Sequence, residues 1–306
     1  MSIVIGIDHG NGLIKTAHSV FKTGVEEFKG GTPIETDKVV RIGNKYYACD
    51  CGHGALKKDK TEDDTYWWLT LAAIGEELKH RDIKDKEIDV ILSVGVPLTT
   101  SENQRKALKK YLCRKDVAFY YGKKRFKISV IKVLIYSQGY SAIMTRIKDF
   151  IEQPVVNVVD VGSWTVDIIQ FNYGKANLGK AASLENGCAR CIKNIIEQVR
   201  RVTDLSVTQE QVEAVLWNGG KIMLPEKAKT EILNAARLYT ENLINEIVEN
   251  GFDTKSAPTV FIGGGATLIK RFYKQSGVFH AEYIEDVRSN ALGYEAIAGV
   301  VLKAKK

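Results

Sequence analysis

The chain has 306 residues, of which 44% are hydrophobic and 26% charged, and its formal net charge is +7. These values are typical of a globular protein of about two domains. No apolar run approaches the ~20 residues of a transmembrane helix, which argues against a membrane-spanning protein. The first residues, MSIVIGIDHG, show neither a basic leader nor a small-residue cleavage site. We therefore expect a cytoplasmic protein.

The N-terminal segment IVIGIDHGNGLIKTA predicts a strand, a polar turn and a second strand. The turn contains Asp8, Gly10, Asn11 and Gly12 between two apolar, largely β-branched runs. A glycine in such a turn lets an anion approach the backbone, where amide groups can hold phosphate oxygens. Lys15 follows Asp8 by one strand length, so its ammonium group can reach back over the turn.

Residues 32–85 combine a short hairpin, a polar loop and an apolar helix, and this change of composition predicts an inserted subdomain within the first half of the chain. Ser101 is followed three residues later by Gln104, which forms a capping box at the start of a helix. The elements expected up to the middle of the chain are a β-meander over 2–30, a hairpin over 39–48, a helix over 66–80, a strand over 88–96, the helix capped by Ser101, a strand over 127–134 and a helix over 137–150.

Positive charge is concentrated between Arg105 and Lys127, where ten Lys or Arg residues accompany one acid, Asp116. Aromatic residues are interleaved with these cations. One interpretation is a surface for nucleic acid or an acidic partner. The other, which we favour, is a solvated helix and hairpin whose aromatic rings face the core.

The five cysteines include two close pairs, Cys49 with Cys51, near His53, and Cys188 with Cys191. Both pairs together could bind zinc. The pairs lie far apart in the sequence, however, and the second pair shares one face of an expected helix. Reduced thiols that pack as small apolar groups are therefore the favoured interpretation.

The central segment VVNVVDVGSWTVDIIQF, residues 155–171, predicts a second hairpin with a polar tip. Aligning Asp8 with Asp160 places Gly10 on Gly162, so the pattern of strand, Asp-x-Gly-[Asn/Ser] and strand occurs twice. Such a repeat suggests two similar domains that each offer a phosphate-binding hairpin to a shared cleft. The alternative is that each aspartate only caps its own hairpin in an Asx-turn.

The second half of the chain is expected to be rich in helices. A run of three glycines, 263–265, joins a strand to a helix and gives a backbone surface without side chains. The expected elements are a helix opened by Gly187, a short helix over 206–213 capped by Ser206, a long helix from Pro225 to Asn250, a strand over 259–262, a helix over 266–275 and a closing helix over 291–301.

Asp8 and Asp160 facing one cleft could not both point at phosphates without a cation between them. Mg²⁺ meets this need, held by the two carboxylates largely through water, as that ion prefers.

The three motifs, in this order over residues 3 to about 270, resemble the phosphate-1, phosphate-2 and adenosine motifs of the actin, Hsp70 and sugar-kinase ATPase superfamily. The run IYSQGYSA, residues 135–142, and the short chain look most like the bacterial ParM/StbA-type plasmid-segregation actins. The resemblance implies an α/β, actin-like (ribonuclease-H-like) fold, with two similar domains around a nucleotide cleft and a smaller inserted subdomain in each. It implies domain I over 1–155 with its insertion at about 32–85, domain II over 156–286 with its insertion at about 204–251, and a C-terminal helix over 287–306 that returns to domain I.

The resemblance also implies the site. Gln138 would orient the water that attacks the γ-phosphate, with Asp8 and Asp160 as the other catalytic residues and as the Mg²⁺ site. Trp164 and His9 depart from the family pattern, and His9 is expected to touch the nucleotide or a filament neighbour. The nucleotide-binding residues implied are Asp8, Gly10, Asn11, Gly12, Lys15, Asp160, Gly162, Ser163, Trp164, Thr165, Gly187, Gly263, Gly264, Gly265 and Ala266.

The function implied is an ATPase that polymerises head to tail with ATP, or GTP, and Mg²⁺. It would move plasmid DNA through a ParR-type DNA-binding adaptor at the plasmid centromere, with no membrane partner and direct nucleic-acid contact less favoured. The alternatives are a sugar- or acetate-type kinase of the same superfamily, a filament with other cargo, and a scaffold that binds no nucleotide.

Overall fold

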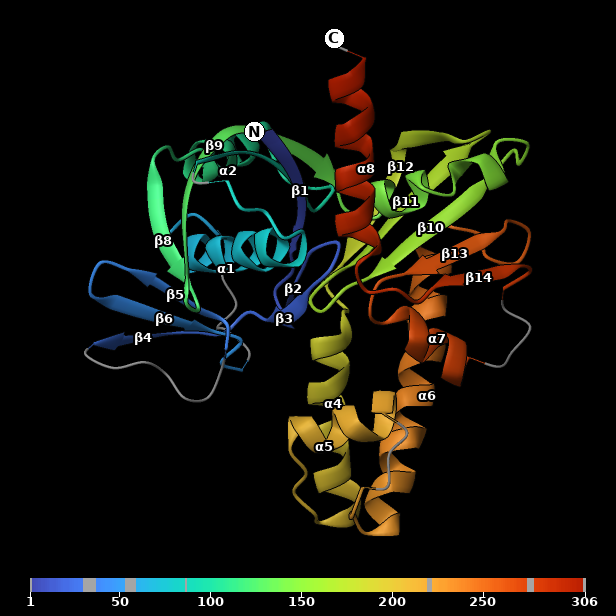
Figure 1. The fold of residues 1–306 in the computed structure, drawn as a ribbon. Coiled ribbons are helices and arrows are strands. Elements are labelled where there is room, and N and C mark those ends of the chain that lie inside the picture. The colour runs from blue at the N-terminus through green and yellow to red at the C-terminus, as the bar shows by residue number, and fades with distance from the viewer. Residues whose placement is uncertain are drawn as a thin grey trace. The chain divides into compact units, whose positions relative to one another are not determined.

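The computed structural model describes residues 2–29, 37–52, 59–85, 87–218, 222–273 and 278–304. The chain divides into two compact units, the first built from Met1–Thr145 with Arg288–Lys306 and the second from Arg146–Val287. Each unit has its own sheet (Figure 1). Each unit also has its own hydrophobic core. Residues 30–36, 53–58 and 305–306 lie outside the described residues. They include part of the expected insertion, His53 and the last two lysines of the sequence.

The sheet of the first unit has nine described strands in the order β3-β2-β1-β7-β9-β8-β5-β6-β4. β1 pairs in parallel with β7, and β7 with β9, so the carboxyl ends of these three strands meet at one edge. The strands are β1 (Ser2–His9), β2 (Leu13–Lys15), β3 (Val20–Lys22), β4 (Val25–Lys29), β5 (Val39–Ile42), β6 (Lys45–Cys49), β7 (Ile88–Val96), β8 (Val117–Tyr121) and β9 (Lys124–Ser137).

The expected meander over residues 2–30 is wrong beyond its first hairpin. The second strand ends at Lys15, because Thr16 and Ser19 close a turn: the Thr16 amide donates to the Ser19 carbonyl at 2.8 Å. A separate strand, β3, follows this turn, and β4 leaves the meander to pair with β6. The hairpin expected over 39–48 is confirmed as β5 and β6.

The helices of the first unit are α1 (Thr65–His80), α2 (Glu102–Leu112), α3 (Tyr140–Met144) and α8 (Ser289–Lys303). The stripe of α1 is buried as expected, with Trp67, Leu71 and Ile74 at most 2% exposed. The capping box of α2 at Ser101 is also confirmed. The last helix, α8, packs against β1, β7 and α3.

The helix expected over 137–150 is wrong. Strand β9 continues to Ser137, which pairs with Val96, and the Gln138 amide then donates to the Val96 carbonyl at 2.9 Å. Gly139 follows with a φ of 72°, a left-handed conformation that no helix continues through. Only the short helix α3 and the 3₁₀ turn η1 (Ile147–Phe150) remain of the expected helix.

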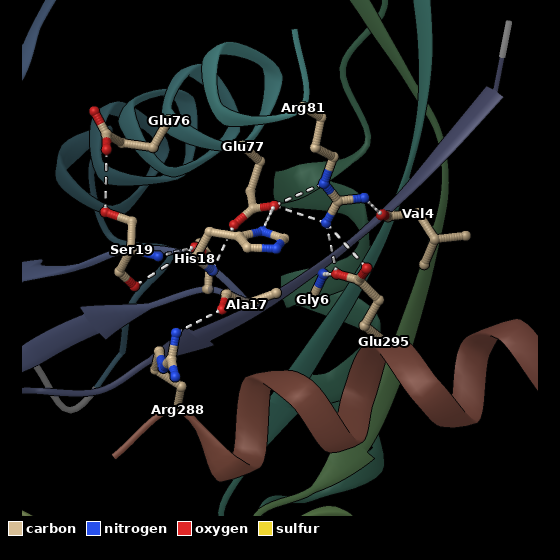
Figure 2. Close-up of polar contacts among 11 residues, drawn as sticks. Val4, Gly6, Ala17, His18, Ser19, Glu76, Glu77, Arg81, Arg288 and Glu295 are labelled. Carbon is tan, nitrogen blue, oxygen red and sulfur yellow. Dashed lines mark hydrogen bonds and ion pairs between the residues drawn. The ribbon is translucent and has the colours of Figure 1, made fainter. Parts of the chain in front are cut away.

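A partly buried ion-pair network joins α1, β1 and α8, as Figure 2 shows. Arg81 donates to Glu77 at 2.8 Å, to Glu295 at 3.0 Å and to the Val4 carbonyl at 3.0 Å. Glu77, which is fully buried, also accepts hydrogen bonds from the backbone amide and the ring of His18. The polar contacts between three elements that are distant in sequence therefore depend on one guanidinium group.

The basic segment 105–127 forms α2, β8 and the start of β9. Its aromatic residues Phe119, Tyr121 and Phe126 are buried, as the favoured interpretation predicted. Several of its cations have partners within the unit. Arg114 lies 2.6 Å from an Asp64 oxygen, and Lys127 lies 2.7 Å from a Glu87 oxygen.

The second unit contains a sheet of five described strands in the order β12-β11-β10-β13-β14. The central hairpin is confirmed as β10 and β11, and the strand over 259–262 as β13. The strands are β10 (Val156–Val161), β11 (Val166–Asn172), β12 (Lys175–Leu184), β13 (Thr259–Ile262) and β14 (Ala281–Ile284). The helices are α4 (Cys188–Thr203), α5 (Gln209–Glu213), η2 (Ala214–Asn218), α6 (Glu226–Glu249) and α7 (Ala266–Phe272).

One cap in the second unit is corrected. Thr208, not Ser206, caps α5, because its hydroxyl accepts the Gln211 amide while the Gln211 side chain returns to the Thr208 amide. This is the same capping box that marks α2, two residues further along than expected. Among the described residues, no helix combines the length and the apolar character needed to cross a membrane.

Candidate functional site

The first cluster of the candidate site lies where β1, β2 and β9 end in the first unit. The β1–β2 register places Asp8 opposite Lys15, and the Lys15 ammonium lies 2.9 Å from Oδ2 of Asp8. Gln138, which follows β9 directly, donates from Nε2 to Oδ1 of Asp8 at 3.0 Å. The sheet therefore brings together three predicted site residues that are up to 130 positions apart in the sequence.

Both oxygens of Asp8 are hydrogen-bonded within this cluster. Burial raises the pKa of Asp8, but the charge and hydrogen bond of Lys15, the hydrogen bond of Gln138 and the charge of Lys60 together hold it below its ordinary value. Asp8 is therefore ionised at neutral pH. Its hydrogen bonds with Lys15 and Gln138 tie the strands together and orient Gln138.

The turn of the first hairpin is held by neighbours on two sides. A side-chain carbon at Gly10 would lie 2.6 Å from the Leu13 carbonyl oxygen, so the turn requires glycine there. The Tyr66 hydroxyl of α1 donates to the Asn11 side chain at 3.3 Å, and Thr23 donates to the Asn11 carbonyl at 2.7 Å. The turn is thus fixed before any ligand binds.

His9 faces α1, and its expected contact with a nucleotide or a filament neighbour stays a prediction. Its side chain is 4% exposed, and Nε2 lies 2.9 Å from the Thr70 hydroxyl. That hydroxyl donates to the Tyr66 carbonyl, so it accepts from Nε2–H of His9. Burial, together with the charge of Lys60, lowers the pKa of His9 to about 3, and the ring is neutral.

A buried neutral histidine makes folding weaker in acid, because the unfolded chain takes up a proton that the folded chain refuses. With a pKa of about 3 in the folded state, wild type should lose about 2 kcal/mol more unfolding free energy between pH 7 and pH 5 than His9→Gln, whose amide can still donate to Thr70. Urea unfolding of both proteins at the two pH values measures this. Equal losses would show that His9 titrates normally in the folded protein.

The second cluster lies at the β10–β11 turn of the second unit. The Gly162 amide donates to the Thr165 carbonyl at 3.0 Å and closes the turn around Ser163 and Trp164. The Trp164 side chain is 38% exposed. Asp160, at the end of β10, is 6% exposed.

The start of α4 is bonded to this turn. The Gly187 amide donates to the Trp164 carbonyl at 2.9 Å, that of Cys188 to Gly162 at 3.0 Å and that of Ala189 to Ser163 at 2.8 Å. A side-chain carbon at Gly187 would lie 2.6 Å from the Ser163 carbonyl oxygen. Gly187 therefore serves close packing of helix against turn, and its contact with a nucleotide stays a prediction.

The glycine run packs against the same turn. Gly263 has a φ of 84°, and a side-chain carbon there would lie 2.6 Å from Oδ1 of Asp160. The Gly265 amide donates to the Val161 carbonyl at 3.0 Å. Around Gly264, among the described residues, a side-chain carbon would meet only Val287, at 3.9 Å. The open backbone of the run is thus at Gly264, just before the buried Ala266 that begins α7.

Sequence reasoning missed Asp167. It lies directly opposite Asp160 in the β10–β11 register, so both carboxylates lie on one face of the hairpin. Asp167 is 4% exposed, and in the described part of the protein its Oδ1 has no hydrogen-bond partner. Burial raises its pKa, although Ser183 and Thr165 oppose this shift. A carboxylate within a run of β-branched residues was the available signal.

The cysteines show no metal cluster in the described residues, where no group of three His, Cys, Asp or Glu could hold an ion. Cys49, Cys188 and Cys191 are buried and reduced. Burial raises the pKa of Cys49 and of Cys191, so both thiols are protonated.

Comparison with known proteins identifies the class. The N-terminal domain of actin-like proteins matches residues 6–140, and the C-terminal domain of the archaeal, MreB-like actin homologues matches residues 158–275. These matches cover most of the chain, each on one of the two strand–turn–strand motifs. The chain belongs to the actin-like ATPase superfamily. No curated protein matches it in sequence.

Solved structures show that the expected actin-like fold is correct. The archaeal actin homologue Ta0583 has a TM-score of 0.73 at 20% identity, over 97% of this chain and 99% of its own. A non-polymerisable quadruple mutant of the pCBH ParM has a TM-score of 0.76 at 18% identity, over 98% and 100%. The apo psk41 ParM has a TM-score of 0.71 at 18% identity, over 99% and 98%. At these identities the likeness shows the fold alone.

Proposed function

We propose that this protein is an ATPase that binds ATP with Mg²⁺, polymerises head to tail, and couples hydrolysis to disassembly. The observation that carries the proposal is the joint contact of Lys15 and Gln138 with the Asp8 carboxylate. It places a cation and an amide beside a turn in which Gly10 and Gly12 carry no side chain that could block a phosphate. The superfamily, which hydrolyses nucleotides in general, supplies the class of reaction.

Each side chain of the site would have a separate role in the reaction. Lys15 would neutralise phosphate charge from its position over the turn. Because a carboxylate only accepts hydrogen bonds, Asp8 requires the nitrogen of the Gln138 amide and leaves its oxygen to accept from the attacking water. Gln138 would orient that water rather than deprotonate it, since an amide is no base.

Asp8 and Asp160 have the hard oxygen donors that Mg²⁺ prefers, and we propose that they hold the ion largely through its waters. Bound there, Mg²⁺ would offset the charge of the phosphates. We propose contacts from both turns, with Gly162, Ser163, Trp164 and Thr165 on the phosphates and 263–266 on the adenosine. We also propose that residues of about 32–85 and 204–251 form the smaller subdomain inserted in each of the two domains.

Related structures support nucleotide binding and assembly. Ta0583 has been solved in complex with ADP, the Bacillus thuringiensis ParM with ATP, and Alp12 as a filament. A heterologous contact that does not close into a ring produces such a filament. We propose plasmid DNA as the cargo, reached through a ParR-type adaptor. The exposed lysines of α2, Lys106, Lys109 and Lys110, would serve adaptor or lateral filament contacts.

The test is light scattering at 90° after addition of Mg-ATP, with phosphate release followed in the same sample. Wild type should scatter and release phosphate, and Asp160→Asn should do neither. The exposed Glu249→Gln in α6 loses one charge outside the site and should behave like wild type. Turnover without scattering at any concentration would overturn the filament proposal and favour a small-molecule kinase. No nucleotide binding at all would favour a scaffold.

A further inference from the structure

Trp217 lies beside the glycine run of the second unit. It belongs to η2 (Ala214–Asn218), the turn of π-helix that follows α5. Its indole nitrogen donates to the Thr267 hydroxyl at 3.0 Å and to the Gly264 carbonyl at 3.3 Å. The Thr267 hydroxyl donates to the same carbonyl at 3.0 Å. The Trp217 side chain is therefore joined to the glycine that forms the open part of the run.

The direction of this hydrogen bond determines how the ring lies. An indole N–H points outward in the plane of its ring, so the edge of Trp217 faces the Gly264 carbonyl and both faces of the ring are turned away from it. The amide of the same peptide, at Gly265, donates to the Val161 carbonyl at 3.0 Å. Both polar groups of the Gly264–Gly265 peptide are thus hydrogen-bonded. The ring and this peptide provide neighbouring flat surfaces, which suit a flat ligand.

The backbone that carries the ring is also fixed. Arg271 of α7 donates from one guanidinium nitrogen to the Val215 carbonyl at 3.0 Å and to the Leu216 carbonyl at 2.7 Å. These two residues come directly before Trp217, whose side chain is only partly buried. An aromatic ring that is held in place before binding loses little conformational freedom when a ligand stacks on it. Short π-helical turns are rare and are frequently found at functional sites.

We infer that Trp217 stacks on the base of the bound nucleotide and makes the site favour purine over pyrimidine nucleotides. The inference rests on the proposed function, which places residues 263–266 on the adenosine, and deepens it by naming the residue that binds the base. A purine offers two fused rings to the indole, whereas a pyrimidine offers one, so the stacking contact is larger for a purine. Stacking does not read the edges of a base, so this contact holds adenine and guanine alike.

The competing explanation is that Trp217 only holds η2 against α7. A structural role predicts that Trp217→Leu lowers the unfolding temperature and changes the affinity for every ligand of the site equally, or for none. A base-binding role predicts a loss confined to ligands that carry a base. Inorganic tripolyphosphate has the phosphates of ATP without its base, so it distinguishes the two roles.

The experiment measures dissociation constants of Mg-ATP, Mg-CTP and Mg-tripolyphosphate for wild type, Trp217→Leu, Trp217→Phe and Phe279→Leu. Phe279 is the matched control, because it is 69% exposed and precedes β14, which runs parallel to β13, at the end of the sheet opposite the glycine run. We expect Trp217→Leu to weaken ATP about five- to 150-fold and tripolyphosphate less than about twofold, and Phe279→Leu to change neither. Trp217→Phe, which keeps a ring, should retain most of the ATP affinity.

Wild type should also bind CTP more weakly than ATP, by a ratio that falls in Trp217→Leu. Equal losses for ATP and tripolyphosphate, or no loss for ATP, would overturn the inference, and an unchanged ATP-to-CTP ratio would overturn the purine preference. Wild type that binds no nucleotide would instead overturn the proposed function.

A second measurement does not depend on a loss of affinity. A base stacked on an indole quenches its fluorescence, so saturating Mg-ATP should quench wild type more than Trp217→Phe. The exposed Trp164 of the β10–β11 turn is present in both proteins, and its response cancels in the difference. Equal changes in fluorescence for the two proteins would contradict a contact between Trp217 and the base.

Discussion

Gln138→Ala should bind ATP with nearly unchanged affinity and hydrolyse it about 100-fold more slowly or worse. The amide contacts Asp8 at 3.0 Å, and in our account its oxygen acts only on the attacking water. The substitution therefore removes an interaction that matters in the transition state and leaves the phosphate contacts of Lys15 intact. Single-turnover phosphate release, together with a separately measured dissociation constant, distinguishes the two effects.

Filaments of this variant should also last longer, because the proposed function couples hydrolysis to disassembly. Gln153→Ala, an exposed position outside both turns, is the matched control and should hydrolyse ATP at the wild-type rate. Wild-type turnover by Gln138→Ala would remove Gln138 from the catalytic site. A large loss of ATP affinity would show instead that its contact with Asp8 shapes the binding turn.

Arg81→Met should destabilise the first unit by about 3–5 kcal/mol, the cost of leaving a buried charge without its partner. Burial raises the pKa of Glu77, but hydrogen bonds from Thr16 and His18 and the charge of Arg81 hold it below its ordinary value. Without Arg81, the buried Glu77 would lose its nearest cation, and Glu295 would lose a 3.0 Å contact (Figure 2). Urea unfolding measures the change.

The matched control is Arg201→Met, an exposed arginine near the end of α4, which should change stability by no more than about 0.5 kcal/mol. Arg81→Met combined with Glu77→Gln should be less destabilised than Arg81→Met alone, because the unpaired charge is then gone while an acceptor for the His18 amide remains. If the double variant is the less stable one, the loss comes from packing of the Arg81 chain rather than from charge.

The sequence was most informative where local pattern and tertiary structure agree. The two strand–turn–strand motifs and strand β13 were predictable, since β-branched runs around Asp-x-Gly turns need no distant partner to be recognised. The Gln138 turn shows the limit. Its surroundings have helical composition, but pairing of Ser137 with Val96 extends β9, and Gly139 then delays the helix. A partner strand some 40 residues away decides the conformation there.

The site shows the same limit. Asp8, Lys15 and Asp160 stand out beside glycine turns, whereas Lys60 has no local signature and Asp167 has only a weak one, a carboxylate within a β-branched run. Lys60 belongs to a polar segment that only the fold brings to the His9 carbonyl. Asp167 becomes noticeable through its register with Asp160 and its burial. In each case the signal lies in three-dimensional proximity and desolvation, which sequence spacing does not express.

The most direct test of the central claim is the rate of phosphate release per protomer, measured with Mg-ATP over a range of protein concentrations. An ATPase whose hydrolysis is coupled to the filament, as proposed, should show a low constant rate up to a threshold concentration and a steep rise above it, at the concentration where scattering begins. A rate per protomer that is the same at every concentration would contradict the account, because the nucleotide site would then work without the filament.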